Sequence, residues 1–105
     1  MIPTIPEMNR IIGELDGWIY SASGHTAKRG RNGPSYKAEF LRYHDSWKHL
    51  KPVIDKIFGF ALAYPDQVKP IIEMRIVVNI KIAHERVYEF ALWYKTQKNE
   101  YKIRQ

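Results

Sequence analysis

The sequence predicts an α+β domain in which about three helices pack on a small antiparallel sheet of about three strands. Two kinds of pattern lead to this class: apolar residues at helical spacing, and apolar residues that alternate with polar ones. They follow one another in the order α-β-β-α-β-α. The 105 residues suit a single domain over 1–105, and 45% of them are hydrophobic, which is enough to bury a core.

The first helix is expected over residues 4–16. Thr4 and Glu7 have the spacing of a capping box, in which the hydroxyl accepts a free N–H of the first turn. Gly17 suits the position just after the helix, where a positive φ is favoured. The expected apolar face consists of Ile5, Met8, Ile12 and Leu15, with Ile11 beside it.

Two strands separated by a long loop are expected next. Residues 18–22 are rich in aromatic and β-branched side chains, and residues 36–41 alternate between apolar and polar. Residues 23–35 contain several glycines, a proline and basic residues, a composition typical of a loop. We therefore expect a hairpin with a long basic tip.

The central helix is expected over residues 43–61, with Asp45 or Ser46 as its N-cap. Pro52 removes one backbone donor inside this segment. That predicts a kink, or a first turn that ends near Leu50 and a helix that restarts after the proline. The expected apolar stripe consists of Trp47, Leu50, Ile54, Ile57, Phe58 and Ala61.

The third strand and the last helix are expected in the C-terminal part. Every second residue is apolar from 71 to 80, which indicates a strand with one face on the core. A helix over about 81–98 follows, with Asn79 as its N-cap, and the polar, basic tail 99–105 is expected to fray. The expected buried stripe of this helix consists of Ala83, Val87, Phe90, Ala91 and Tyr94.

The chain is basic, with a net charge of +6 from 17 basic and 11 acidic residues. Clustered positive charge favours polyanions or acidic protein surfaces as partners. The excess lies in residues 24–37 and 94–105, while Tyr88 and Trp93 fall off the main stripe of the last helix and are expected to form an exposed aromatic patch. The predicted partner or nucleic-acid contacts are Lys28, Arg29, Arg31, Lys37, Tyr88, Trp93, Lys95, Lys98, Lys102 and Arg104.

Several kinds of chemistry are disfavoured by the residue types and their spacing. The chain has no cysteine, which excludes disulfides, a thiolate nucleophile and cysteine-based zinc sites. His44, Asp45 and His49 do not converge at helical spacing as metal ligands must. A metal-free ribonuclease that recruits His25 and His44 stays open, but we expect no catalytic residue, no metal and no cofactor.

The sequence predicts no contact with a membrane. No apolar run approaches the roughly 20 residues that cross a bilayer. Residues 1–10 lack the basic region and apolar core of a secretory signal. We therefore expect a cytoplasmic protein.

Three segments together resemble a family of small, uncharacterised phage and prophage proteins of Bacteroidetes and, more distantly, the phage ABA-sandwich domain. They lie in residues 8–18, 43–57 and 82–94, and the likeness is clearest in Tyr43-His44-Asp45-Ser46-Trp47 and Val87-Tyr88-Glu89-Phe90-Ala91-Leu92-Trp93-Tyr94. The resemblance implies a fold of helices packed around a small sheet. It also implies that the protein acts in the cytoplasm of a bacterial host cell. It supplies no catalytic or binding residue that could be carried over to this chain.

The favoured functional hypothesis is a non-catalytic, phage-type accessory protein that binds a host protein with an acidic surface. The resemblance makes this a counter-defence inhibitor similar to an anti-CRISPR, with a nucleic-acid-guided nuclease complex as the kind of target. The alternative is direct binding of RNA or DNA through the basic loop and the C-terminal basic residues. A homo-oligomer is compatible with either hypothesis.

Overall fold

The computed structural model describes residues 2–73 and 79–104, with the backbone alone for 98–104. Within these ranges, four α-helices and a three-stranded antiparallel sheet confirm the predicted α+β class. The elements are α1 (Ile5–Leu15), β1 (Trp18–Tyr20), β2 (Thr26–Arg29), β3 (Ser35–Lys37), the 3-10 helix η1 (Ala38–Phe40), α2 (Trp47–Phe58), α3 (Pro65–Ile72) and α4 (Ile80–Arg104).

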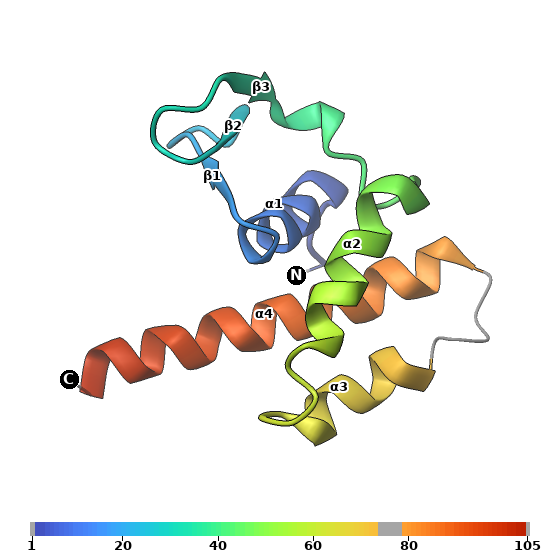
Figure 1. Cartoon of the computed structure of the whole chain (residues 1–105). Helices are drawn as coiled ribbons and strands as arrows, with labels where there is room; N and C mark the ends of the chain where they lie inside the picture. Colours follow the sequence, from blue (N-terminus) through green and yellow to red (C-terminus); the bar gives the residue numbers. More distant parts are fainter. Residues whose placement is uncertain (1, 74–78, 105) are drawn as a thin grey trace.

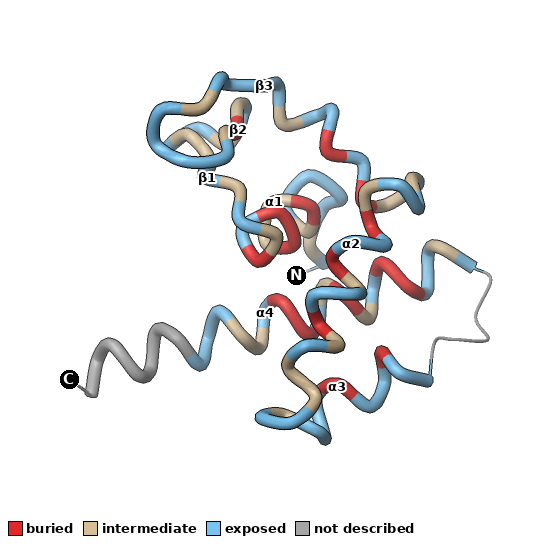
Figure 2. Tube along the Cα trace, viewed as in Figure 1, coloured by how far each residue is buried: buried red, intermediate tan, exposed pale blue. Residues whose placement is uncertain are grey.

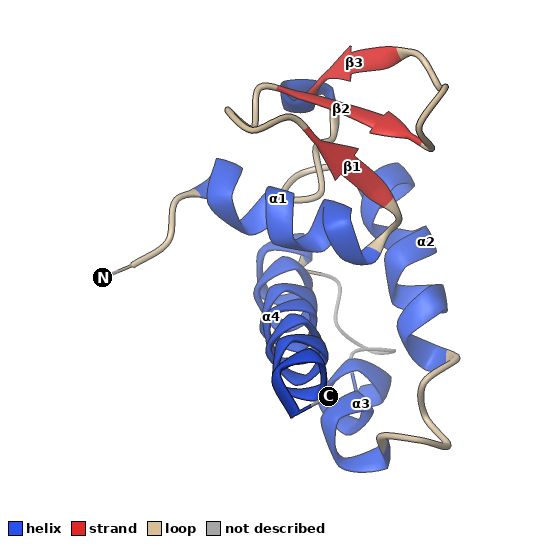
Figure 3. Ribbon diagram, turned by 90° about the vertical axis from the view of Figure 1, so that its left-hand side faces the viewer, coloured by secondary structure: helices blue, strands red, loops and turns tan. Residues whose placement is uncertain are grey.

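The elements form layers, with α1 between the sheet and the other helices (Figure 1). Helix α1 contacts β1 on one side and α4 on the other, and Figure 3 shows the sheet above α1 and α4 below it. Helices α2, α3 and α4 pack against one another. The core is formed by buried residues of α1, α2, α3 and α4 (Figure 2). Its largest buried apolar side chains are Tyr43, Ile12, Leu50, Ile57, Ile71, Val53, Val68 and Val87.

Helix α1 has the predicted caps, and its buried face agrees with the prediction at Ile12 and Leu15 but not at Ile5. The Thr4 hydroxyl accepts a hydrogen bond from the Glu7 amide at 3.3 Å, and Gly17 follows the helix with a φ of 99°. Ile5, expected on the core face, is exposed. The difference arises because β1 and α4 cover α1 from two sides. Asn9 and Gly13 are buried there because small or polar residues allow these elements to approach α1 closely. The buried residues of α1 are Asn9, Ile12, Gly13 and Leu15.

The sheet has the order β1-β2-β3. Trp18 of β1 pairs with Arg29 of β2, and Ala27 of β2 pairs with Tyr36 of β3. Strand β2 falls within residues 23–35, which were predicted to be a loop, so this prediction is wrong in part. Only Ala27 of β2 is buried. The strand therefore lacks the apolar alternation by which a sequence reveals one.

The strand predicted over 36–41 is shorter than expected. Strand β3 ends at Lys37, and the chain continues as η1. The Ala38 amide still donates to the His25 carbonyl at 2.8 Å, and the Leu41 amide then donates to the Ala38 carbonyl at 3.0 Å. Because β2 begins directly after His25, the residues beyond Ala38 have no strand beside them and turn toward α2.

Helix α2 runs from Trp47 to Phe58 as one helix, so it does not restart after Pro52. Ser46 occupies the N-cap position without a side-chain hydrogen bond. Trp47 was expected on the core stripe, yet 42% of its surface is exposed. Leu50 and Ile57 of the predicted stripe are fully buried, and Val53, which was not predicted, is buried with them.

The third strand predicted over 71–80 is absent wherever the structure describes this segment. Ile71 and Ile72 end α3, Ile80 begins α4, and residues 74–78 lie outside the described residues. Val68 and Ile71 are both buried and lie three positions apart on α3. This helical period competes with the two-residue period that suggested a strand.

Helix α4 begins with the predicted cap and ends later than predicted. The Asn79 side-chain oxygen accepts from the Lys81 amide at 2.9 Å. The backbone is helical to Arg104, beyond the expected end at Lys98 and through the tail that was expected to fray. His84 joins Ala83, Val87, Phe90 and Ala91 among the buried residues, whereas Tyr94 is half-buried. No helix in the described part of the chain is long and apolar enough to span a membrane.

Candidate functional site

A groove of about 820 Å³ opens between α1, the turn from β1 to β2, and the segment from β3 to α2. The residues that form its walls include several cations and histidines and one acid, Glu39. The cations and histidines are Arg10, His25, Lys37, Arg42 and His44. Three elements distant in sequence thus place groups suited to an anionic ligand around one space.

The cations of the groove differ in how far they are neutralised. Arg10 Nε lies 3.7 Å from the Glu14 carboxylate, and Arg42 is hydrogen-bonded through two nitrogens to Asp45. Exposed pairs of this kind contribute little energy and can exchange partners. The backbone of Lys37 pairs with Thr26 of β2, but its side chain forms no hydrogen bond or ion pair within the described residues. It is therefore the most available cation of the groove.

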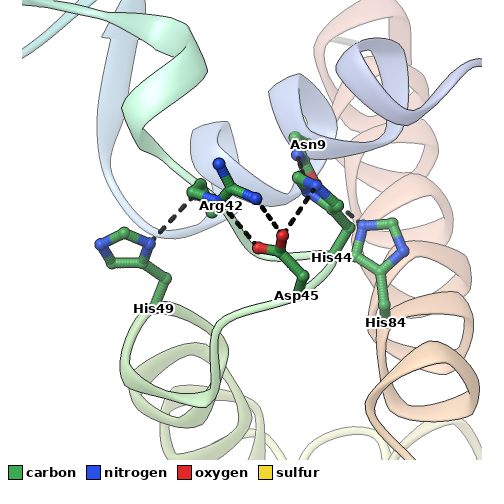
Figure 4. A network of polar contacts seen from close by, with 6 residues as sticks. All are labelled: Asn9, Arg42, His44, Asp45, His49 and His84. Carbon is green, nitrogen blue, oxygen red and sulfur yellow. Dashed lines mark hydrogen bonds and ion pairs between the residues drawn. The ribbon is translucent and has the colours of Figure 1, made fainter.

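Asn9 is one of the residues that line the groove, and it joins two histidines (Figure 4). Its amide nitrogen donates to His44 Nδ1 at 3.0 Å, and its amide oxygen accepts from His84 Nε2 at 2.8 Å. With the amide in this orientation, both imidazole rings carry a proton on Nε2. One side chain of α1 thereby ties α4 to the segment that precedes α2.

The environment of this network keeps His84 neutral. Only 2% of the His84 surface is exposed. Burial, followed by the nearby His44, lowers the pKa of His84, and Glu85 opposes the shift. The neutral ring satisfies Asn9 without bringing a charge into the core.

His44 and His49 are engaged within the segment from Arg42 to α2. His44 Nε2 lies 3.6 Å from the Asp45 carboxylate, and His49 Nδ1 accepts from the Arg42 amide at 3.0 Å. The hydrogen bond from Arg42 lowers the pKa of Asp45. A general base needs a lone pair directed at its substrate, whereas the Nδ1 lone pair of His44 faces Asn9. This geometry suits a structural junction, and the expectation that the chain has no catalytic residue stays a prediction.

Tyr20 forms one wall of the groove and is held against α1. Its hydroxyl donates to the Asn9 carbonyl at 3.3 Å. Burial, with a smaller effect of Glu14, raises the pKa of Tyr20 to about 12. The guanidinium of Arg10 lies over its ring at 5.7 Å from the centroid. The phenol is therefore a fixed donor and a stacking surface for Arg10.

The exposed face of the sheet carries two of the predicted contacts. Lys28 pairs with Ile19 on β1 and with Ser35 on β3, and Lys37 pairs with Thr26. Because side chains alternate along strands, Lys28 and Lys37 project from the same face, as diagonal neighbours about 7–8 Å apart. Lys37 also lines the groove, so the sheet face and the groove form one continuous surface.

Arg29 and Arg31 belong to different environments, although the sequence grouped them. Arg29 donates to the Asp16 carbonyl at 2.9 Å and to its carboxylate at 3.1 Å, and its guanidinium lies 4.5 Å from the Trp18 ring centroid. The carbonyl of Arg31 accepts from Lys28 Nζ at 2.9 Å. Arg29 therefore fastens β2 to the end of α1, while Arg31 is exposed in the turn after β2.

The predicted contacts on α4 lie apart from the groove. Lys95 Nζ lies 3.6 Å from the Glu14 carboxylate, and the side chains of Lys98, Lys102 and Arg104 lie outside the described part of the structure. The end of α4 that carries these three residues extends beyond α2 and α3 (Figure 1).

Tyr88 and Trp93 do not form the exposed aromatic patch that was expected. Both are half-buried against the core. Trp93 packs edge-on to Tyr64, with 5.0 Å between the ring centroids, and lies 5.8 Å from Phe90. For Trp93 the prediction fails because Tyr64, from the segment between α2 and α3, packs against its ring.

Sequence reasoning missed Asn9, Arg10 and Arg42. A polar residue within the apolar run of the first helix was the one available signal for Asn9. Arg10 and Arg42 carry no local signal, since only the fold brings them to the groove. In the described residues, no group of three or more His, Asp or Glu side chains could hold a metal ion.

Comparisons with family models, curated proteins and solved structures find no match to this chain. The resemblance to phage proteins therefore stays a prediction.

Proposed function

We propose that the protein binds nucleic acid through the basic surface formed by the exposed sheet face and the adjoining groove. The observation that carries the proposal is the placement of Lys28 and Lys37 on one sheet face, beside the turn that contains Arg31. Residues 24–37 contain no acid. Apart from Arg29, which is paired with Asp16, the cations of this segment can attract phosphates, which account for most of the sequence-independent affinity for nucleic acid.

The groove extends this surface toward α1. Lys37 stands at the junction, and Arg10, Arg42 and His25 follow along the walls. Arg10 and Arg42 already have carboxylate partners at exposed positions. A phosphate can replace such a partner at little cost, because an exposed ion pair contributes little energy. A phosphate backbone that leaves the sheet face would thus meet further donors.

An acidic host protein, the partner that the sequence favoured, would use the same cations. Complementary charge guides both kinds of association, so salt dependence alone does not separate them. A direct test with purified nucleic acid does, because it contains no host protein. A protein that retains no oligonucleotide at low salt would refute our proposal and leave the acidic protein partner as the function to test.

The test measures the anisotropy of fluorescent oligonucleotides as salt is raised from about 50 to 300 mM. The variant Lys28→Ala/Arg31→Ala/Lys37→Ala removes three cations of the surface, and Lys48→Ala/Lys51→Ala/Lys69→Ala removes three exposed lysines elsewhere. We expect the first variant to bind more weakly than the wild type. For single strands, its slope of log affinity against log salt should be shallower than that of the wild type by about 2. The second should resemble the wild type. Equal losses in both variants would contradict the proposal.

A further inference from the structure

The opposite face of the sheet holds a second, apolar groove of about 390 Å³. Trp18 and Tyr36, from the two edge strands, stand edge-on across it, with ring centroids 6.1 Å apart and planes at 87°. Phe40 of η1 completes the aromatic wall. The remaining lining residues are Arg29, Pro34, Leu41 and His49.

Two of these rings are open to a ligand. Tyr36 is 50% exposed and Phe40 is 60% exposed, although large aromatic side chains usually bury most of their surface. The Trp18 ring is less accessible, because the Arg29 guanidinium lies over it. Tyr36 and Phe40 are therefore the surfaces on which a planar group could stack.

The aromatic groove lies beside the cations of the basic surface. Tyr36 and Lys37 are consecutive on the edge strand β3, so their side chains project to opposite faces. A chain that crosses this edge would meet an ammonium on one side and an aromatic ring on the other. Glu39 is the sole acid between residues 24 and 41. The surroundings are thus complementary to a polyanion that carries planar groups.

We infer that the aromatic groove stacks unpaired nucleobases, which makes single-stranded nucleic acid the ligand class of the basic surface. The inference rests on the proposed function and deepens it. Every base has a π face, so stacking on Tyr36 and Phe40 needs no particular sequence. The bases of a duplex are already stacked on one another and cannot enter the groove. The protein therefore prefers single strands to duplexes of the same sequence.

The test compares one labelled oligonucleotide as a single strand and as a duplex, using wild type and Tyr36→Ala/Phe40→Ala. We expect the wild type to bind the single strand at least about tenfold more tightly, since each stacked base contributes roughly 5- to 150-fold in affinity. The double variant should lose this preference while its salt slope stays unchanged. Tyr36→Phe should bind as the wild type does, because the ring is kept.

A 2-aminopurine base in the single strand reports stacking directly. Its fluorescence should be quenched by the wild type and by Tyr36→Phe, and should recover in the double variant. Leu62→Ala, at a fully exposed position between α2 and α3, serves as the control for loss of an apolar side chain. Thermal unfolding confirms that each variant is folded.

The outcomes separate the inference from the function on which it rests. Equal affinity for single strand and duplex, or wild-type binding by the double variant, would overturn the inference and leave the proposed function standing. If the wild type binds no oligonucleotide, single-stranded or duplex, both the inference and the proposed function are refuted. Binding of a proline-rich peptide in place of bases, the other ligand that an aromatic groove can take, would likewise overturn the inference.

Discussion

At the residue scale, Asn9 shows how one buried polar side chain can hold several segments of the chain together. It supplies a donor and an acceptor at once, to His44 and to His84. An apolar residue of similar size would leave His44 Nδ1 and His84 Nε2 without this partner, and a charged residue would add the cost of desolvation. The backbone of the same residue accepts from Tyr20. Asn9 thus connects the groove, the sheet and α4.

We expect Asn9→Ala to lower the free energy of unfolding by about 1–3 kcal/mol, the usual penalty for an unsatisfied buried polar group. Urea denaturation measures this difference. Asn32→Ala, which changes an exposed residue at the tip of the hairpin, is the matched control and should cost little. Similar stability of the two variants would show that the Asn9 network contributes nothing.

At the element scale, the packing of α1 on β1 depends on a glycine. A Cβ at Gly13 would lie 2.1 Å from the Tyr20 hydroxyl oxygen and 2.9 Å from two carbons of its ring. The ring is held in place by the hydrogen bond from its hydroxyl to Asn9. The helix and the strand can therefore approach closely only because position 13 has no side chain.

Gly13→Ala tests this contact against helix propensity. Propensity alone predicts a gain of about 1 kcal/mol in a helix interior. We expect the opposite, a loss of about 1–3 kcal/mol from overpacking, measured by urea denaturation. In a Tyr20→Leu background the clash is removed, and Gly13→Ala should become neutral or stabilising. The same loss in both backgrounds would rule out the steric explanation.

At the scale of the whole molecule, polar ties at two points fasten the sheet to the helices. Asp16 accepts from Arg29 on β2 and from Tyr43, whose hydroxyl lies 2.8 Å from its carboxylate. Burial, followed by the charge of Asp16, raises the pKa of Tyr43, which keeps this donor protonated. The Asn9 network is the second tie. It contains histidine, so part of the connection between layers should depend on pH.

The sign of the pH dependence follows from His84. Its pKa in the folded protein lies below the ordinary value of 6.5, because burial disfavours the charged ring. The unfolded chain therefore binds the proton first as the pH falls. We expect the contribution of His84 to the free energy of unfolding to be fully present above a pH of about 6.5 and to decline as the pH falls below it.

Urea denaturation from about pH 8 to about pH 5 measures the decline. His84→Gln keeps an N–H donor for Asn9 and does not titrate, so its stability should fall less steeply over this range. His25→Gln, at an exposed position, should keep the wild-type dependence. An equally steep decline in His84→Gln would assign the pH dependence to other groups.

Local signals made much of the fold predictable. The caps at Thr4 and Asn79, the glycine after the first helix and the helical stripes containing Leu50, Ile57 and Val87 were all visible in the sequence, and the structure contains them. Each depends on residues within one or two turns of each other. The basic hairpin was equally visible as a cluster of charge, and it forms the centre of the candidate site.

The remaining features depend on neighbours from elsewhere in the chain. Strand β2 exists because β1 and β3 flank it, not because of its own alternation. The segment 71–80 had a two-residue period, yet its first residues serve the helical face of α3. The groove needs α1, the β1–β2 turn and the segment before α2 to converge, and no local pattern encodes that meeting.

The sequence by itself therefore determined the α+β class, the capped helices and the concentration of cations in residues 24–37, since these follow from composition and from contacts a few residues apart. Only the tertiary structure decided which cations are available and which are structural. It placed Lys28 and Lys37 on an open sheet face and committed Arg29 to Asp16 and Trp18. The physical reason is that a charge is neutralised by the groups around it in space, and folding brings those groups from distant parts of the chain.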